Sequence, residues 1–212
     1  MTSETVVVVS GGPPPAEAAA KGLPDDAYVI AADSGLDHAR VIGLRVDLVV
    51  GDLDSVSAGA LAAAEAAGTS VEPHPAAKDQ TDLELALDQA IARNPARIIV
   101  LGSAGGRLDH LLAGGLGLAS ERYATVAIEA RLGPATVTVI RDEVLLHGRS
   151  GELVTLVPVG GPARGITTKG LLYPLDDEDL ASGTSRGVSN EFLGAEARVV
   201  VRSGVLLAIQ PG

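Results

Sequence analysis

The 212-residue chain has no cysteine, no tryptophan, one phenylalanine and three tyrosines. Without cysteine it cannot form disulfides, a Cys-ligated zinc site, an iron–sulfur cluster or a thiol nucleophile. Basic residues are also few: 16 Lys and Arg stand against 27 Asp and Glu, which gives a net charge of −11. Binding to nucleic acid or to an anionic membrane surface needs clustered cations, so we expect neither kind of partner.

Long apolar runs are missing as well. No stretch approaches the roughly 18 apolar residues that a membrane span needs, and no basic segment precedes the four valines of Val6–Val9. We therefore expect a cytoplasmic protein. What the chain does contain is Ala, Val and Leu in quantity. Apolar residues make up 46% of it, which is enough for a substantial core.

Short β-branched runs alternate with Ala-rich stretches in the first part of the chain. The predicted buried strands are Val6–Val9, Tyr28–Ala32, Asp47–Val50 and Arg97–Leu101. The predicted helices are Ala16–Lys21, Leu36–Ile42, Ser57–Ala67, Asp82–Ala92 and Leu108–Ser120. The fourth helix is the clearest, because Thr81 and Glu84 form a capping-box pattern at its start. This alternation predicts a mostly parallel sheet with helices on both faces.

From about Gly133 onward the pattern changes to strands joined by Gly- or Pro-containing turns. The predicted strand regions are Ala135–Gly148, Glu152–Gly161, Gly165–Leu171 and Ala197–Gln210, with one brief helix at Asp176–Ala181. Such a pattern suits an antiparallel sandwich or barrel. The predicted fold class is therefore α/β: an N-terminal, mostly parallel α/β domain (1–132) followed by a C-terminal antiparallel β-sandwich domain (133–212).

Polar residues gather where the predicted strands end. In an open α/β sheet, ligands bind beyond the carboxyl ends of the strands. Asp52 and Asp54 leave the third strand two positions apart, and Mg²⁺ prefers such hard oxygen ligands. An alternative is that Asp52 caps the helix that begins near Ser57, while Asp54 is a solvated turn residue. The pattern alone favours neither.

A second acidic pair, Asp79 and Asp82, brackets the start of a predicted helix. Alone, these two carboxylates are explained by the helix dipole. Together with Asp52 and Asp54 they place four negative charges at one edge of the sheet, where they repel one another unless a cation gathers them. If the loops are adjacent, a magnesium site follows.

The segment Gly105-Gly106-Arg107 has the properties of a phosphate cradle: a permissive backbone, free amide donors, a helix N-terminus and a guanidinium. The alternative is an ordinary surface loop. No Walker A or dinucleotide fingerprint is present. The G-x-S-x-G spacing of Gly183–Gly187 lacks the strand and helix that a nucleophile elbow requires.

Taken together, these motifs resemble the thiamine pyrophosphokinase family. The resemblance covers nearly the whole chain, and its specificity lies in the order and spacing of weak motifs. The matching segments are Asp33–Gly35, Gly51–Ser55, Lys78–Asp82, Gly105–His110, Gly165–Leu171, Tyr173–Leu175 and Gly187–Phe192. The resemblance implies transfer of a pyrophosphoryl group from ATP to the hydroxyl of thiamine, giving thiamine diphosphate and AMP. It also implies a homodimer whose sites lie between the α/β domain of one subunit and the β domain of the other.

The resemblance assigns roles by position. The Mg²⁺-binding and catalytic carboxylates would be Asp52, Asp54, Asp79 and Asp82, with Arg107 as a further catalytic residue. ATP-binding residues would be Asp33, Ser34, Gly35, Lys78, Thr81, Gly105, Gly106, Arg107, Asp109 and His110. Thiamine-binding residues would be Thr168, Leu171, Tyr173, Ser189 and Asn190.

Two points stay open at this stage. Some family members place a Trp against thiamine, and this chain has none, so Tyr173 or Leu171 would substitute. The segment Gly187–Phe192 would, without the resemblance, be a plain β-turn. Two other functions are compatible with some of the same residues. One is a Mg²⁺-dependent nucleotide pyrophosphohydrolase, which needs the same acidic residues but uses water as acceptor. The other is a non-catalytic module that senses nucleotide or thiamine.

Overall fold

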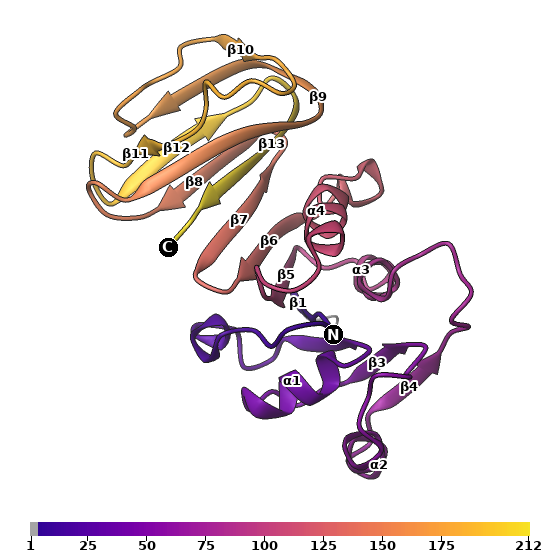
Figure 1. The fold of residues 1–212 in the computed structure, drawn as a ribbon. Helices are drawn as coiled ribbons and strands as arrows, with labels where there is room; N and C mark the ends of the chain where they lie inside the picture. Colours follow the sequence, from indigo (N-terminus) through magenta and orange to yellow (C-terminus); the bar gives the residue numbers. More distant parts are fainter. Residues whose placement is uncertain (1–3) are drawn as a thin grey trace. The chain divides into compact units, whose positions relative to one another are not determined.

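The structure, a computed structural model, describes residues 4–212 and divides into two compact units (Figure 1). Unit 1 comprises the described residues up to Gly114 together with Thr125–Gly133. Unit 2 comprises Gly115–Ala124 and Pro134–Gly212. Within the described range, no helix has both the length and the apolar character needed to cross a bilayer.

Unit 1 is built on a parallel sheet with the strand order β4-β3-β2-β1-β5-β6, in which every neighbouring pair is parallel. The strands are β1 (Thr5–Val9), β2 (Tyr28–Ala32), β3 (Leu48–Gly51), β4 (Ser70–Pro73), β5 (Arg97–Gly102) and β6 (Ala127–Leu132). The parallel arrangement confirms the prediction for this part of the chain. Strands β4 and β6 were not predicted. β4 is short and half-exposed, and it ends in a proline, so it lacks the apolar run that marked the others.

Helices cover both faces of this sheet. They are α1 (Gly35–Val41), α2 (Ala58–Ala66) and α3 (Asp82–Ala92), with a 3-10 turn, η1, at Glu17–Ala20. Figure 1 shows α1 and α2 on one side of the sheet and α3 on the other. On the α1 side, Val7 and Val9 pack with Leu36 and Ala60. Because alternate strand residues point to opposite faces and all five residues of β1 are buried, both faces of the central strand are covered.

The next helix, α4 (Leu108–Gly117), has no buried residue and begins directly after the Gly105–Gly106 segment. Unit 2 then contains a second 3-10 turn, η2 (Glu121–Tyr123).

Unit 2 is antiparallel. Its strands are β7 (Ala135–Ile140), β8 (Glu143–His147), β9 (Leu153–Lys169), β10 (Glu178–Leu180), β11 (Asn190–Glu191), β12 (Glu196–Val200) and β13 (Ser203–Gln210). They follow the order β7-β13-β9-β12-β8, and β10 and β11 also pair with β9. The change from parallel to antiparallel strands therefore follows the predicted pattern.

Two predictions for unit 2 are wrong in detail. The brief helix expected at Asp176–Ala181 is instead strand β10, because Glu178 and Leu180 pair with β9 and Leu180 is buried. The strands expected at Glu152–Gly161 and Gly165–Leu171 form one continuous 17-residue strand, β9. Its glycines and prolines suggested a turn, but β9 pairs with β13 on both sides of a register shift between Val159 and Arg164, and it then pairs with β12.

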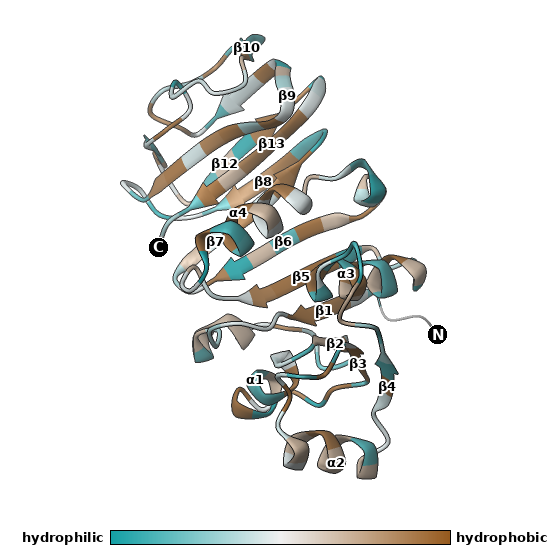
Figure 2. Cartoon of the chain, turned by 45° about the vertical axis from the view of Figure 1, so that its right-hand side comes forward, coloured by the Kyte–Doolittle hydropathy of each residue, from teal (hydrophilic) through white to brown (hydrophobic). Residues whose placement is uncertain are grey.

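The two units differ in how their strands are patterned. Figure 2 shows β1 and β5 coloured as apolar along most of their length, as expected for parallel strands buried on both faces. Strand β9 alternates between buried and more exposed positions over much of its length, which is typical of an antiparallel strand with one face toward a core. The core of unit 2 includes Ile140, Leu156, Phe192 and Val199.

Candidate functional site

Three aspartates from separate loops meet at the carboxyl edge of the parallel sheet. Asp33 follows β2, Asp52 follows β3, and Asp82 is the first residue of α3. One carboxylate oxygen from each lies within 4.8 Å of the others. We call these three residues the acidic cluster. Its position agrees with the general rule that ligands bind beyond the carboxyl ends of parallel strands.

The backbone around the acidic cluster is tightly constrained. Asp33 has a φ of 49°, and its N–H donates to the carbonyl of Val50 at 2.8 Å. A Cβ at Gly35 would lie 2.1 Å from the carbonyl oxygen of Val9, so only glycine fits there. Gly51 has a φ of 142°, and a Cβ on it would approach Asp82 Oδ1 to 3.0 Å. The close approach of the backbone lets the three carboxylates converge.

The carboxylates of the acidic cluster are short of partners. Asp33 is only 9% exposed. Oδ1 of Asp33 and Oδ1 of Asp82 are buried and accept no hydrogen bond of good geometry. Burial raises the pKa of Asp33 above its ordinary value, and the neighbouring charges of Asp82 and Asp52 raise it further, against hydrogen bonds from Ser34 and Ser55. Buried polar atoms are normally hydrogen-bonded, so these oxygens are free to bind a ligand.

Lys78 is the cation that faces the acidic cluster. Its Nζ lies 3.1 Å from Asp82 Oδ1 and 3.7 Å from Asp52 Oδ2, and its side chain is 15% exposed. The 3.1 Å approach is an ion-pair distance that does not satisfy the lone pair of Asp82 in hydrogen-bonding geometry. Burial lowers the pKa of Lys78, but the carboxylates of Asp82 and Asp52 outweigh burial and raise it. The ammonium therefore stays charged.

The donor set of the acidic cluster fits Mg²⁺. This ion takes hard oxygen ligands and is usually held by one or two carboxylates together with substrate phosphates. The cluster offers three carboxylates and two buried oxygens that lack hydrogen bonds. Like charges held this close are stabilised when a divalent cation joins them.

Asp54 and Asp79, the other two carboxylates predicted as metal ligands, lie outside the group of described residues that could share an ion. Both are exposed. The Asp54 carboxylate accepts a hydrogen bond from Ser55 Oγ at 2.8 Å, and the backbone N–H of Asp54 donates to Asp52 Oδ1 at 3.3 Å. The structure brings Asp33 into the cluster instead, a residue that the sequence associated with ATP.

The structure also resolves the capping alternatives. Ser57, and not Asp52, is the N-cap of α2: its Oγ accepts the N–H of Ala60 at 3.3 Å. The capping box at α3 is confirmed. Thr81 Oγ1 accepts the N–H of Glu84 at 3.2 Å, and Glu84 Oε2 accepts the N–H of Thr81 at 2.9 Å. The hydroxyl of Thr81, a residue predicted to bind ATP, therefore serves as the N-cap of α3.

The Gly105–Gly106 segment and Arg107 lie after β5. Gly106 has a φ of 83°, and a Cβ on it would lie 2.8 Å from Pro13 in the loop that follows β1. Arg107 forms two hydrogen bonds to Asp109, at 2.6 and 3.1 Å, and their side chains are 70% and 65% exposed. This pairing lowers the pKa of Asp109 to about 2. His110 is exposed, and its N–H donates to Asp109 at 3.0 Å.

The loop after β1 was not singled out from the sequence. The N–H of Ser10 donates to the carbonyl of Leu101 at 2.9 Å, and a Cβ on Gly11 would lie 3.0 Å from Ser34 Oγ. The loop therefore sits at the same sheet edge as Ser34 and close to the segment after β5. The adjacent pair Gly11 and Gly12, directly after a strand, was the signal that could have found it.

The predicted thiamine-binding residues all belong to unit 2. Thr168 and Asn190 are buried and hydrogen-bonded, Leu171 is buried, and Tyr173 and Ser189 are exposed. The first four meet around the segment 170–175. Ser189 has a φ of 57°, and its N–H donates to Thr155 Oγ1 at 3.0 Å.

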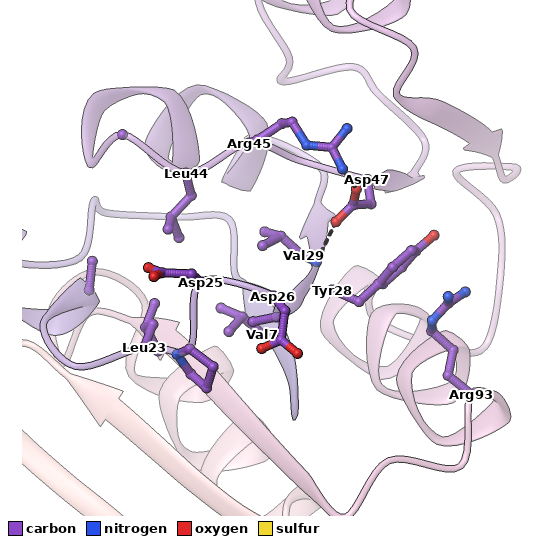
Figure 3. A pocket seen from close by; sticks show the side chains of 14 residues that line it. Val7, Leu23, Asp25, Asp26, Tyr28, Val29, Leu44, Arg45, Asp47 and Arg93 are labelled. Carbon is purple, nitrogen blue, oxygen red and sulfur yellow. Dashed lines mark hydrogen bonds and ion pairs between the residues drawn. The ribbon is translucent and has the colours of Figure 1, made fainter. Parts of the chain in front are cut away.

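A hollow of about 550 Å³ lies on unit 1 away from the acidic cluster, beside the loops that lead into β2 and β3 (Figure 3). Three of the charged residues that line it contact other side chains. Arg45 forms an ion pair with Asp47, which also accepts the N–H of Val29 at 2.9 Å. The guanidinium of Arg93 stacks 3.3 Å above the Tyr28 ring. None of the predicted site residues lines this hollow.

Comparisons with known proteins give a consistent result. Residues 20–123 match the family described as thiamin pyrophosphokinase, catalytic domain, and residues 137–206 match the one described as thiamin pyrophosphokinase, vitamin B1 binding domain. Thiamine pyrophosphokinase of Bacillus subtilis (strain 168) is 28% identical over 190 residues, which are 83% of this chain and 85% of that protein.

Solved structures agree in fold over nearly the full length. The crystal structure of thiamine pyrophosphokinase from Bacillus subtilis matches with a TM-score of 0.85 and 25% identity, covering 97% of this chain and 98% of that one. The enzyme from Geobacillus thermodenitrificans matches with a TM-score of 0.82 and 26% identity, covering 98% and 97%.

Proposed function

Because the chain belongs to the thiamine pyrophosphokinase family, we propose that it transfers the pyrophosphoryl group of ATP to the hydroxyl of thiamine. The products are thiamine diphosphate and AMP. The hydroxyl oxygen of thiamine forms a bond to the β-phosphorus, and the bond from that phosphorus to the oxygen bridging to the α-phosphate breaks. The observation that carries the proposal is the acidic cluster at the carboxyl edge of the parallel sheet, with two buried oxygens that accept no hydrogen bond, one of them ion-paired with Lys78.

Asp33, Asp52 and Asp82 would hold Mg²⁺, with Asp54 and Asp79 as the further carboxylates that the family resemblance assigns. A bound Mg²⁺ supplies charge neutralisation to the phosphate oxygens. The protein's own groups do the positioning. A carboxylate such as Asp82 orients the thiamine hydroxyl and accepts its proton.

Cations of the chain support the same proposal. Lys78 already faces the acidic cluster and can turn its ammonium toward a phosphate. Arg107 is held by Asp109 in an exposed pair, and exposed pairs contribute little to stability. Its guanidinium can therefore exchange that partner for a phosphate at small cost. The other proposed ATP-site residues are Ser34, Gly35, Thr81, Gly105, Gly106 and His110. Thr81 would contribute indirectly, because it caps the helix that carries Asp82.

We assign ATP and Mg²⁺ binding to the α/β part, predicted as 1–132, and thiamine binding to the antiparallel part, predicted as 133–212. We further propose that the latter is a β-sandwich whose two layers share β9. Its support is that side chains from β7, β8, β12 and β13 enter one buried core. A cytoplasmic location stays a prediction.

A homodimer with shared sites is part of the proposal. Its support is exposed apolar surface in unit 2, where Tyr173, Val188 and Leu193 are 63%, 51% and 58% exposed. Large exposed apolar groups on a folded protein mark surfaces that bind partners. Gel filtration tests this part: elution at the 21.3 kDa monomer mass would contradict the shared site.

The reaction itself is tested by incubating the protein with ATP and Mg²⁺, with and without thiamine, and separating the products by chromatography. We expect AMP and thiamine diphosphate to appear together, and EDTA to abolish both. AMP release that ignores thiamine would instead show a nucleotide pyrophosphohydrolase. Bound ligand without turnover would show a sensing module.

A further inference from the structure

The segment Gly170–Leu175, which follows β9, presents two apolar side chains to solvent. We call it the 170–175 loop. Its start is fixed, because Gly170 has a φ of 81° and a Cβ there would lie 2.4 Å from the carbonyl oxygen of Glu196. Leu171 is buried and forms a β-bridge with Phe192. Leu172 and Tyr173 then project outward, with exposures of 43% and 63%.

The backbone of Tyr173 is held by one buried side chain, Asn190. The N–H of Tyr173 donates to Asn190 Oδ1 at 3.0 Å, and Asn190 Nδ2 donates to the carbonyl of Tyr173 at 2.7 Å. Asn190 Oδ1 also accepts the N–H of Glu191 at 2.9 Å. An amide oxygen has two lone pairs, so this acceptor is saturated and cannot receive a ligand donor.

Thr168 holds the other end of the 170–175 loop. Its Oγ1 accepts the N–H of Leu175 at 2.9 Å, and its own N–H donates to the carbonyl of Leu175 at 2.9 Å. Thr168 is 4% exposed and Asn190 is 7% exposed. Burial at this level keeps both side chains behind the loop.

These contacts give Asn190 and Thr168 a structural role that does not require direct contact with thiamine. We propose that both are positioning residues, which fix the 170–175 loop so that the Tyr173 ring is presented as the aromatic surface for thiamine. This inference rests on the proposed function. Ordering the loop before the substrate arrives removes an entropy cost from thiamine binding, while ATP binding and the chemical step are untouched.

The test compares hydroxyl deletions on neighbouring residues of β9. Thr168→Val removes the hydroxyl that accepts from Leu175 and keeps the shape, and Thr168→Ser restores the hydroxyl. Thr167→Val is the matched control, because Thr167 Oγ1 accepts the N–H of Asp177 at 3.2 Å, outside the loop. Each variant is measured for kcat, for KM of thiamine and of ATP, and for amide hydrogen exchange in the 170–175 loop.

We expect Thr168→Val to raise the KM for thiamine about tenfold, with kcat and the KM for ATP changed less than about threefold. Amide exchange at Tyr173 and Leu175 should accelerate. Thr168→Ser should restore both quantities, and Thr167→Val should leave both near the wild-type values. Equal changes of KM in Thr168→Val and Thr167→Val would overturn the proposal, because the effect would then not depend on the loop.

A second variant covers the case in which Thr168→Val does not fold. Asn190→Asp keeps oxygens that accept from Tyr173 and Glu191 but lacks the donor to the Tyr173 carbonyl. It should raise the KM for thiamine and accelerate exchange at Tyr173. An unchanged KM in a folded variant contradicts the positioning role alone. Wild-type protein that releases no AMP in response to thiamine contradicts the proposed function instead, so the two failures are distinguishable.

Discussion

The two units differ in whether their buried polar side chains at the proposed sites are hydrogen-bonded. At the acidic cluster of unit 1, Oδ1 of Asp33 and Oδ1 of Asp82 are buried without hydrogen bonds. In unit 2, the buried side chains of Thr168 and Asn190 have hydrogen-bond partners in the 170–175 loop. A buried polar atom without a hydrogen bond costs about 1–3 kcal/mol, and at the acidic cluster a bound cation would offset this cost.

This difference separates two kinds of functional residue. In the proposed function, the oxygens of unit 1 that lack hydrogen bonds bind a cation, so substituting them should affect catalysis more than stability. The partnered side chains of unit 2 shape a loop, so they act through backbone position. Each of the following experiments tests one side of that contrast.

The largest effect is expected at the acidic cluster. Asp82→Asn removes one of the converging negative charges, and we expect kcat/KM to fall about a thousandfold, equivalent to about 4 kcal/mol of transition-state stabilisation. The free energy of unfolding should change by less than about 1 kcal/mol, because relief of the repulsion with Asp33 and Asp52 offsets the lost ion pair with Lys78. Steady-state kinetics and urea denaturation measure the two quantities. The matched control is Asp26→Asn, an exposed carboxylate beside the hollow of Figure 3; a similar loss there would make the effect nonspecific.

In the core of unit 2, a substitution should reduce stability more than catalysis. Phe192 is 1% exposed and packs against Gly148, where a Cβ would lie 3.0 Å from the ring. Phe192→Ala should lower the free energy of unfolding by about 3–5 kcal/mol through cavity formation. Leu145→Ala, on β8 of the same unit with 47% exposure, should change it by less than about 0.5 kcal/mol. Chemical denaturation measures the free energy of unfolding of both variants. Equal losses of stability would show that burial of the Phe192 ring does not explain the effect.

Magnesium should stabilise unit 1 through the acidic cluster. At a concentration of about 100 times its Kd, an ion that binds only the folded state adds about 2.7 kcal/mol to the free energy of unfolding. Asp33→Asn should abolish most of this gain, because it removes a buried charged ligand. Thermal unfolding with Mg²⁺ and with EDTA measures the difference. A gain that persists in full in Asp33→Asn would place the ion elsewhere.

The smallest effect is expected at the cap of α3. Thr81→Ala removes the side-chain acceptor of the capping box and should cost about 1 kcal/mol of stability. Thr81→Ser retains a hydroxyl and should restore most of it. Because α3 carries Asp82 at its first position, we also expect a modest loss of activity in Thr81→Ala. No change in either quantity would mean that packing alone fixes the start of this helix.

Most of the parallel sheet could be predicted from the sequence, because its central strands are short apolar runs with buried residues on both faces. β2 and α3 begin and end at the predicted residues. β4 and β10 could not be found in this way. Both are short strands with charged residues, and pairing with β3 and β9 makes them strands.

The candidate site was predicted less completely than the fold. Asp52 and Asp54 are two positions apart, so an extended backbone would point their side chains to the same side. Leu53 instead has a φ of 62°, which breaks the extended path between them and leaves Asp54 exposed. Asp33 joins Asp52 because β2 and β3 are neighbours, a relation that depends on strand order and is not visible in local spacing.

The path of the chain between the units has a consequence for how the protein is made. Gly115–Ala124 belongs to unit 2, yet the chain then returns to unit 1 to form β6 before it leaves again. Arg141 of unit 2 donates to the carbonyls of Ala119 and Ser120 at 2.6 and 2.8 Å, so this early segment is part of the later unit. On the ribosome, neither unit can finish folding until the chain has passed Gly133. A gene fragment that begins after Gly133 would lack the Gly115–Ala124 piece of unit 2, whereas a fragment that ends there would carry that piece in addition to the strands of unit 1.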